Sequence, residues 1–200
     1  MTTNRRLLIA TGNPGKVAEF RTLLEGCGWD VVAPADIGLP RVEVIETSRS
    51  YLENAITKAV RHAEASGLPS LADDSGLEVD ALDGRPGVIS ARYGGPQAAT
   101  AAARNALLLG ELEGVPTGRR GARFRAVLAL AIPNGETYVR EATVEGRIAA
   151  APHGADGFGY DPIFELPDGR SMAELGEDKH AISHRGLAAR EIIDVLRELA

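Results

Sequence analysis

Apolar residues near the start of the chain alternate between a short continuous run and a helical repeat. Residues 7–10 form a run of four apolar residues, which is typical of a buried strand. Asn13 and Pro14 then provide a helix cap and a proline suited to the first helical position. Apolar residues at helical spacing follow over 17–24, and a second apolar pair stands at 31–32. The pattern predicts an opening strand, helix and strand.

A longer helix is predicted after a loop-like segment over 34–47 that is rich in Pro, Gly and acidic residues. Ser50 and Glu53 have the spacing of a capping box. One apolar face repeats over residues 52–63, and Gly67 provides a stop. We therefore expect a long helix that begins at this capping box and stops before Gly67.

The rest of the chain continues the alternation and then adds a hairpin. Beyond the long helix we expect a strand at 71–72, an acidic turn at 73–76, an apolar stretch at 77–79, a helix over 97–110, two strands over 124–132 and 137–148 and a last helix over about 186–199. Asn134 and Gly135, between the two late strands, are a strong signal for a tight antiparallel turn. Alternating elements followed by a hairpin predict an α/β protein with a mixed sheet.

Composition narrows the class of protein without selecting a function. The 200 residues are 44% hydrophobic and 25% charged, which is typical of a single globular domain covering 1–200. The net charge of -6 disfavours binding to nucleic acid or to an anionic membrane. Cys27 has no second cysteine to pair with, and no apolar run approaches a membrane span, so we expect a cytoplasmic protein.

The first candidate site lies between the first strand and the first helix. Thr11, Gly12, Asn13, Pro14, Gly15 and Lys16 follow one another there. Free N–H groups at a helix N-terminus, together with a lysine on the first turn, favour binding of a phosphate. The glycine spacing is not that of a Walker A loop. On its own, a tight turn with an exposed lysine explains the segment equally well.

The second candidate site is the acidic turn. Adjacent strand residues point to opposite faces, so only one of Asp73 and Asp74 is expected to face a given site. A carboxylate there suits Mg²⁺, which takes oxygen ligands and enters with substrate phosphates. Glu43 and Glu46, in the preceding loop, are both candidates for a second carboxylate. Taken singly, each of these acids is more often a solvated loop residue.

Two later segments could recognise a base and further phosphates. Phe158 and Tyr160 flank Gly159 in a chain with only 4% aromatic residues, which suggests a flat stacking surface, although packing of the hairpin is an equal alternative. Lys179, His184 and Arg185 lie near the start of the last helix and favour a second anion site. Of the three lysines in the chain, only Lys58 falls outside these candidate sites, so we expect it to be replaceable.

Several motifs in one order carry a family resemblance. They are TGNPGK at 11–16, ENAITKA at 53–59, LADDSGLEVDAL at 71–82, PGVISARYGG at 86–95, FGYDPIF at 158–164 and KHAISHRG at 179–186. The chain resembles the inosine triphosphatase or XTP/dITP diphosphatase family, and especially its bacterial members. The resemblance covers nearly the whole chain.

The resemblance implies an enzyme and assigns its residues. It implies Mg²⁺-dependent hydrolysis of XTP, ITP and dITP to the monophosphate and pyrophosphate, which removes deaminated purines from the nucleotide pool. Asp74 would bind the metal and act as the catalytic base, with Glu46 as a further metal ligand. The substrate would contact Thr11, Gly12, Asn13, Pro14, Gly15, Lys16, Ser75, Phe158, Gly159, Tyr160, Asp161, Lys179, His184 and Arg185.

The same resemblance implies an elongated mixed sheet flanked by helices, with two lobes, the active site in the cleft between them, and a homodimer. Hydrogen-bond donors near His184 and Arg185 would favour the 6-oxo group of hypoxanthine and xanthine over the amino group of adenine. Two other functions stay open at this point: a pyrophosphatase for a different base, and a nucleotide-binding or RNA-binding module without hydrolytic activity.

Overall fold

The strand order of the central sheet differs from the order along the chain. The computed structural model describes residues 5–44 and 49–199. Six strands form one sheet in the order β2-β1-β3-β4-β5-β6. β1 pairs in parallel with β2 and β3, so that Leu8 lies opposite Val32 on one side and Ser70 on the other. β5 and β6 pair antiparallel, so the sheet is mixed, as predicted.

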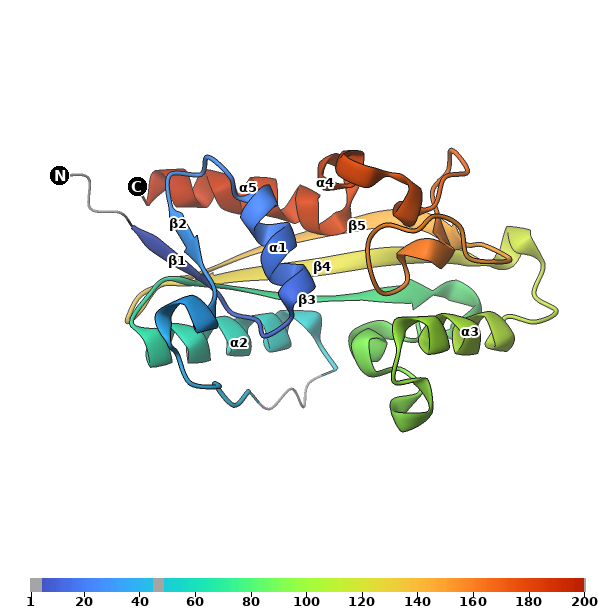
Figure 1. Cartoon of the computed structure of the whole chain (residues 1–200), viewed down its shortest axis with the longest axis horizontal. Coiled ribbons are helices and arrows are strands. Elements are labelled where there is room, and N and C mark those ends of the chain that lie inside the picture. The colour runs from blue at the N-terminus through green and yellow to red at the C-terminus, as the bar shows by residue number, and fades with distance from the viewer. Residues whose placement is uncertain (1–4, 45–48, 200) are drawn as a thin grey trace. The chain divides into compact units, whose positions relative to one another are not determined.

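Helices and strands alternate over most of the chain (Figure 1). The strands are β1 (Arg6–Ile9), β2 (Asp30–Val32), β3 (Ser70–Val79), β4 (Gly121–Ala131), β5 (Thr137–Ile148) and β6 (Phe164–Glu165). The helices are α1 (Pro14–Leu23), α2 (Tyr51–Ser66), α3 (Ala101–Glu111), α4 (Lys179–Ile182) and α5 (His184–Glu198). No helix of the described residues combines the length and the apolar character that crossing a membrane requires.

The predicted helix ends are confirmed by their local contacts. Asn13 caps α1, with Pro14 as the first helical residue. The Ser50 side chain accepts a hydrogen bond from the Glu53 N–H, and α2 ends at Gly67 with φ of 69°. This left-handed conformation favours glycine because it has no Cβ. Local sequence therefore determines where these helices begin and end.

Two compact units divide the chain, and their boundaries fall inside β3, β4 and β5 and after the first residue of α5. The first unit comprises the described residues of Met1–Asp74, Ala126–Ala142 and Arg185–Ala200, and the second comprises Ser75–Arg125 and Thr143–His184. That residues 1–200 act as a single domain stays a prediction.

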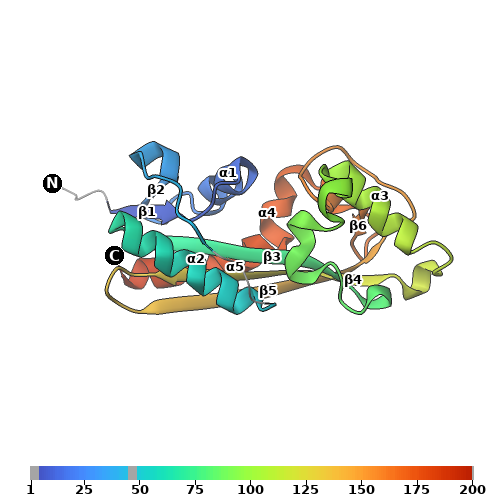
Figure 2. The same ribbon diagram turned by 90° about the horizontal axis from the view of Figure 1, so that it is seen from below.

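The first unit has its own apolar core. Phe20 and Leu24 of α1 and Ile192 and Leu196 of α5 belong to one buried cluster. The strand residues of this cluster include Leu7, Ile9, Leu71, Leu128 and Leu130. Because side chains alternate along a strand, the intervening residues face the other side of the sheet. Helix α2 lies on that other side of the strands from α5 (Figures 1 and 2).

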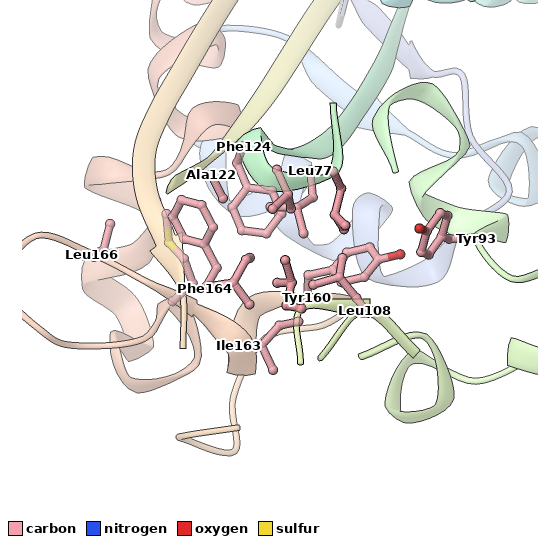
Figure 3. Packing of buried hydrophobic residues seen from close by; sticks show 14 of the residues in the cluster. Leu77, Tyr93, Leu108, Ala122, Phe124, Tyr160, Ile163, Phe164 and Leu166 are labelled. Atoms are coloured by element: carbon pink, nitrogen blue, oxygen red, sulfur yellow. The ribbon is translucent and has the colours of Figure 1, made fainter. Parts of the chain in front are cut away.

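The second unit has a separate core that includes several aromatic rings. Phe124 and Phe164 have ring centroids 4.4 Å apart. Figure 3 shows Tyr160 within this cluster beside Leu108 of α3. Two of the four tyrosines in the chain, Tyr93 and Tyr160, are buried here.

One predicted element is wrong. Residues 73–76 form no turn, because β3 continues without interruption from Ser70 to Val79. Asp73 and Asp74 are 5% and 7% exposed, and both have cationic partners. Neutralised in this way, two acidic residues can remain inside a buried strand. The predicted turn between β4 and β5 is confirmed, with Asn134 at φ of 56°.

Candidate active site

Asp73 and Asp74 contact different helices. Asp73 Oδ2 lies 2.8 Å from the Lys16 ammonium of α1 and 2.9 Å from Arg185 Nε of α5. Asp74 Oδ1 lies 2.7 Å from the Lys58 ammonium of α2. Since α1 and α5 share one apolar cluster and α2 lies on the other side of the strands, the two carboxylates point to opposite faces. This confirms that only one of them faces a given site.

Four charged side chains form what we call the charge cluster: Lys16, Glu19, Asp73 and Arg185. Arg185 is 3% exposed and bridges two carboxylates, with Nε 2.9 Å from Asp73 Oδ2 and Nη1 2.8 Å from Glu19 Oε2. Asp73 in turn accepts from Lys16. Charges alternate along this chain of contacts, which is how buried ions compensate one another.

Burial and charge act in opposite directions on Asp73. Burial alone would raise the pKa of its carboxyl group, but the Arg185 guanidinium and the Lys16 ammonium outweigh it and hold that pKa well below the usual range. For Lys16, burial is the largest influence and lowers the pKa of the ammonium, although Asp73 opposes the change. Asp73 is therefore ionised at neutral pH, and its negative charge holds the lysine in place.

A second group, the acid–lysine pair of Asp74 and Lys58, lies on the α2 face. Asn54 Nδ2 donates to Asp74 Oδ2 over 3.1 Å, so both carboxylate oxygens are held. Lys58 also donates to the carbonyl oxygen of Asp73 over 3.2 Å. The expectation that Lys58 lies outside the candidate sites is wrong, because it contacts the predicted catalytic acid directly.

The sequence contains a signal for this pair that our reading missed. Asn54 and Lys58 are four residues apart and lie on the same side of α2 as the buried Ala55 and Ala59. An amide and an ammonium on an apolar helix face require polar partners inside the protein. Glu19, on the turn after Lys16, gives the same signal on α1 and is 7% exposed.

The loop at 11–16 is placed as predicted, but the N–H groups at the start of α1 are occupied. Asn13 Oδ1 accepts from the N–H of Gly15 at 2.9 Å and of Lys16 at 3.4 Å. Thr11 Oγ1 accepts from the N–H of Asn13 at 3.1 Å, and Pro14 has no N–H. Free amide groups, which the sequence led us to expect at this helix end, are therefore replaced by an internally capped turn.

The predicted metal ligands are placed only in part. Asp74 is described, whereas Glu46 lies outside the described residues. Glu43 is exposed and lines a shallow hollow with Thr57 and Arg61 of α2. The described part of the chain contains no group of three or more His, Cys, Asp or Glu residues arranged to hold a metal ion. A site with one or two carboxylates remains compatible with Mg²⁺, which retains water and phosphate ligands.

In the second unit, residues 157–161 form what we call the aromatic segment. Phe158 is 38% exposed, and the Lys179 ammonium lies 4.8 Å from the centroid of its ring. Tyr160 is 5% exposed and donates through its hydroxyl to the Ser90 carbonyl. Burial accordingly raises the pKa of Tyr160 above its usual value. The predicted two-ring surface is wrong for Tyr160, which belongs to the core, and leaves Phe158 as the exposed ring.

The remaining predicted residues are buried or half-buried. Lys179 is 8% exposed and lies 2.8 Å from Asp161 Oδ2. His184 stacks on Phe124 with ring centroids 4.8 Å apart. Ser75 is half-buried in β3, directly after Asp74. Because Nε and Nη1 of Arg185 bind carboxylates, its predicted role in reading a base is not supported by these contacts and stays a prediction.

Comparison with known proteins decides the family. The model of the Ham1 family matches residues 7–195. The chain belongs to the Ham1 family. Its relatives include a protein named dITP/XTP pyrophosphatase from Thermus thermophilus, 47% identical over 99% of this chain and 95% of the relative. Another of that name from Bacillus subtilis is 48% identical over 96% of this chain and 97% of the relative. The family resemblance drawn from the motifs is thereby confirmed.

Solved Ham1 structures agree with the fold. A HAM1 protein from Coxiella burnetii is 40% identical and superposes with a TM-score of 0.86 over 97% of this chain and 99% of that chain. A nucleoside-triphosphatase, or dITP/XTP pyrophosphatase, from Mycobacterium abscessus is 45% identical, with a TM-score of 0.72 over 94% and 98%. The α/β fold with a mixed sheet and flanking helices is therefore that of Ham1 proteins.

Proposed function

We propose that this Ham1 protein is a nucleoside triphosphate pyrophosphohydrolase that acts on dITP, XTP and ITP. The observation that carries the proposal is similarity over almost the whole chain, at nearly half identity, to proteins named dITP/XTP pyrophosphatase. Such an activity removes deaminated purine nucleotides before they enter nucleic acids. The described side chains support it with an acid, several cations and an exposed aromatic ring.

The proposed reaction places Asp74 as the catalytic base. The oxygen of a water molecule attacks the α-phosphorus, and the bond from that phosphorus to the α,β-bridging oxygen breaks. The nucleoside monophosphate and pyrophosphate leave, and the proton of the water passes to the Asp74 carboxylate. Lys58 and Asn54 support this role because they hold both oxygens of that carboxylate. A fixed base of this kind lowers the barrier mainly by orientation.

We propose Mg²⁺ as the cofactor, held by Asp74 and Glu46. When bound, it would neutralise charge on the phosphates. The donor chemistry fits, because a carboxylate oxygen is the kind of ligand that Mg²⁺ takes, and substrate phosphates complete a sparse site. Asp74 Oδ1 lies 2.7 Å from the Lys58 ammonium, so a positive charge already lies beside this carboxylate.

For the phosphates we propose the loop at 11–16 together with Lys16. The charge cluster and the acid–lysine pair contain three cations and three carboxylates, which cancel: Lys16, Lys58 and Arg185 against Glu19, Asp73 and Asp74. A polyanion that binds here therefore competes with the protein's own carboxylates for each cation. For the base we propose Phe158, since stacking on an aromatic ring is tolerant of base identity and stabilises by about 1–3 kcal/mol.

The test of the activity is a nucleotide panel with detection of pyrophosphate. We expect release from dITP, XTP and ITP in the presence of Mg²⁺, and much less from dATP and dTTP. Preference for a nucleotide without a 6-oxo purine would overturn the proposed substrate class. Nucleotide binding without pyrophosphate release would overturn the enzymatic function itself.

The test of Asp74 is the variant Asp74→Asn, which keeps the shape of the side chain and removes its charge. We expect kcat for dITP to fall at least about 100-fold, as for loss of a general base. Asp80→Asn is a matched control, because Asp80 follows the same strand and its side chain is 53% exposed. A near-normal kcat for Asp74→Asn would show that another group acts as the base.

We also propose that the protein is a cytoplasmic homodimer. The resemblance of the whole chain to the family supports the homodimer. The single cysteine, Cys27, is buried and has no partner for a disulfide within the chain, which fits a reducing compartment. Light scattering tests the homodimer, and a mass of one chain would contradict it. Fractionation of cells tests the cytoplasmic location.

A further inference from the structure

The aromatic segment is a loop whose conformation depends on side-chain anchors. Gly157 and Gly159 have φ of 77° and 66°, values that residues with a Cβ rarely adopt. Phe158 lies between them, and its N–H donates to Asp161 Oδ2 over 2.7 Å. Phe158 lies outside the strands and helices, so the contacts of its own segment contribute to its position.

Each of the last three residues of the segment has an anchor in the second unit. Asp161 accepts from Lys179, and Tyr160 donates to the Ser90 carbonyl. The Gly159 carbonyl accepts from Nδ2 of Asn105 over 3.1 Å, across 54 positions of the sequence. Lys179 and Tyr160 belong to the family motifs identified above, whereas Asn105 lies outside all of them.

Asn105 lies where an asparagine side chain is energetically unfavourable. It lies on the buried side of α3, is 6% exposed, and shares that side with Leu108. Asparagine is a weaker helix former than leucine, and a buried amide oxygen without a donor is unfavourable. Within the described residues, Asn105 Oδ1 is buried and accepts no hydrogen bond. Packing alone would favour an apolar residue here, so the hydrogen bond to the Gly159 carbonyl explains why an amide side chain occupies this position.

We propose that Asn105 is a positioning residue for the nucleobase. Through the Gly159 carbonyl it fixes the backbone on one side of Phe158 and so keeps the exposed ring over Lys179, ready to stack on a purine. The inference rests on the proposed function, because it deepens the role given there to Phe158. It does not place Asn105 in contact with the substrate or with the reacting phosphate.

The test is the variant Asn105→Leu, which keeps the branch at Cγ and the number of side-chain heavy atoms and removes both the donor and the unsatisfied oxygen. We expect KM for dITP and XTP to rise about fivefold, the effect of one lost hydrogen bond, with kcat within about twofold of the wild type. Inhibition by imidodiphosphate, which contains no base, should keep its Ki. Asn105→Ala serves as a second variant in case leucine does not fit.

A matched control separates positioning from stability. Thr100 Oγ1 caps α3 by accepting from the Ala103 N–H over 3.1 Å, and it lies outside the aromatic segment. Thr100→Ala should lower Tm by a few degrees while leaving KM unchanged. The inference is overturned if both Asn105 variants keep the wild-type KM, or if Thr100→Ala raises KM and the imidodiphosphate Ki as much as they do.

Failure of the proposed function can be distinguished from failure of the inference about Asn105. If the wild-type protein does not hydrolyse dITP, the proposed function is wrong, whereas the role of Asn105 in positioning Phe158 can still be tested. Calorimetric binding of 2′-deoxyinosine 5′-monophosphate to the wild type and to the Asn105 variants then decides the inference. Weaker binding by the variants supports it, and equal binding overturns it.

Discussion

The charge cluster of the first unit and the aromatic segment of the second unit both pair a lysine with a buried aspartate at 2.8 Å. In the charge cluster, Asp73 lies on a strand, and its partners lie on two helices. In the aromatic segment, Asp161 begins a short 3-10 turn and also accepts from the backbone of Phe158. The same ion pair thus joins regular elements in one unit and holds a loop in the other.

This difference predicts where substitutions act. Removing one charged side chain of the charge cluster should reduce stability, because its buried partner is left without an opposite charge. Loss of a residue in the aromatic segment should mainly change binding of the substrate. Substitutions in the charge cluster and in the aromatic segment test this difference, and one in the acid–lysine pair extends it to the catalytic acid.

Arg185→Leu should have the largest effect. It removes the cation between two buried carboxylates, Asp73 and Glu19, and breaking such a network costs about 3–5 kcal/mol in free energy of unfolding. Urea unfolding measures it. Arg197→Leu is the control, because its ion pair with Asp194 is exposed and should contribute almost nothing. Equal stability of the two variants would show that the charge cluster does not stabilise the first unit.

Lys58→Met should have the next largest effect, on turnover. Without the ammonium, Asp74 loses the partner that fixes Oδ1, and we expect kcat for dITP to fall about 100-fold. Arg61→Met, one turn further along α2 with its side chain 63% exposed, is the matched control. A kcat unchanged by Lys58→Met would restore the view that this lysine is replaceable.

The low pKa of Asp73 predicts a pH dependence. A carboxyl group with a depressed pKa in the folded state contributes stability above its ordinary pKa of about 3.9, and that contribution is lost as the pH falls toward the folded value. The difference in unfolding free energy between the wild type and Asp73→Asn should therefore stay constant from pH 7 to 5. Below pH 4 it should shrink by up to about 1.4 kcal/mol per pH unit. A decline already between pH 7 and 5 would contradict the depressed pKa.

Phe158→Ala should have the smallest effect on stability, while it clearly weakens binding of the substrate. We expect KM for dITP to rise about tenfold, within the range of a lost stacking contact, and the free energy of unfolding to stay nearly unchanged because the ring is 38% exposed. Tyr160→Phe keeps the buried ring but loses the hydroxyl that anchors the segment to the Ser90 carbonyl. It should cost about 1 kcal/mol of stability and raise KM less than Phe158→Ala does. Reversed results would mean that the core ring, not the exposed one, meets the base.

The sequence predicts elements whose signals are local. Asn13 with Pro14, Ser50 with Glu53, and Gly67 determine helix ends through contacts within a few residues, and all are confirmed. Asn134 determines its turn in the same way. Capping and turn preferences act over one helical turn or less, so they survive in any tertiary setting.

Features that depend on distant partners were not predictable. The acidic residues at 73 and 74 suggest a turn until Arg185, 112 positions from Asp73, neutralises one of them. The exposure of Phe158 and the burial of Tyr160 likewise depend on packing against α3 and on the Ser90 carbonyl. For the candidate site, the chemistry of single residues was accessible from sequence, whereas their pairing required the fold.

The Asn13 cap has a consequence for anion binding. Its carboxamide oxygen stands where a phosphate oxygen would accept the N–H groups of Gly15 and Lys16. An anion that uses these groups therefore exchanges one acceptor for another, and only the difference between the two contributes to its affinity. A small lone anion gains little from such an exchange. A polyphosphate that also reached a lysine would gain more, so the internal cap would favour long phosphate chains over small inorganic anions.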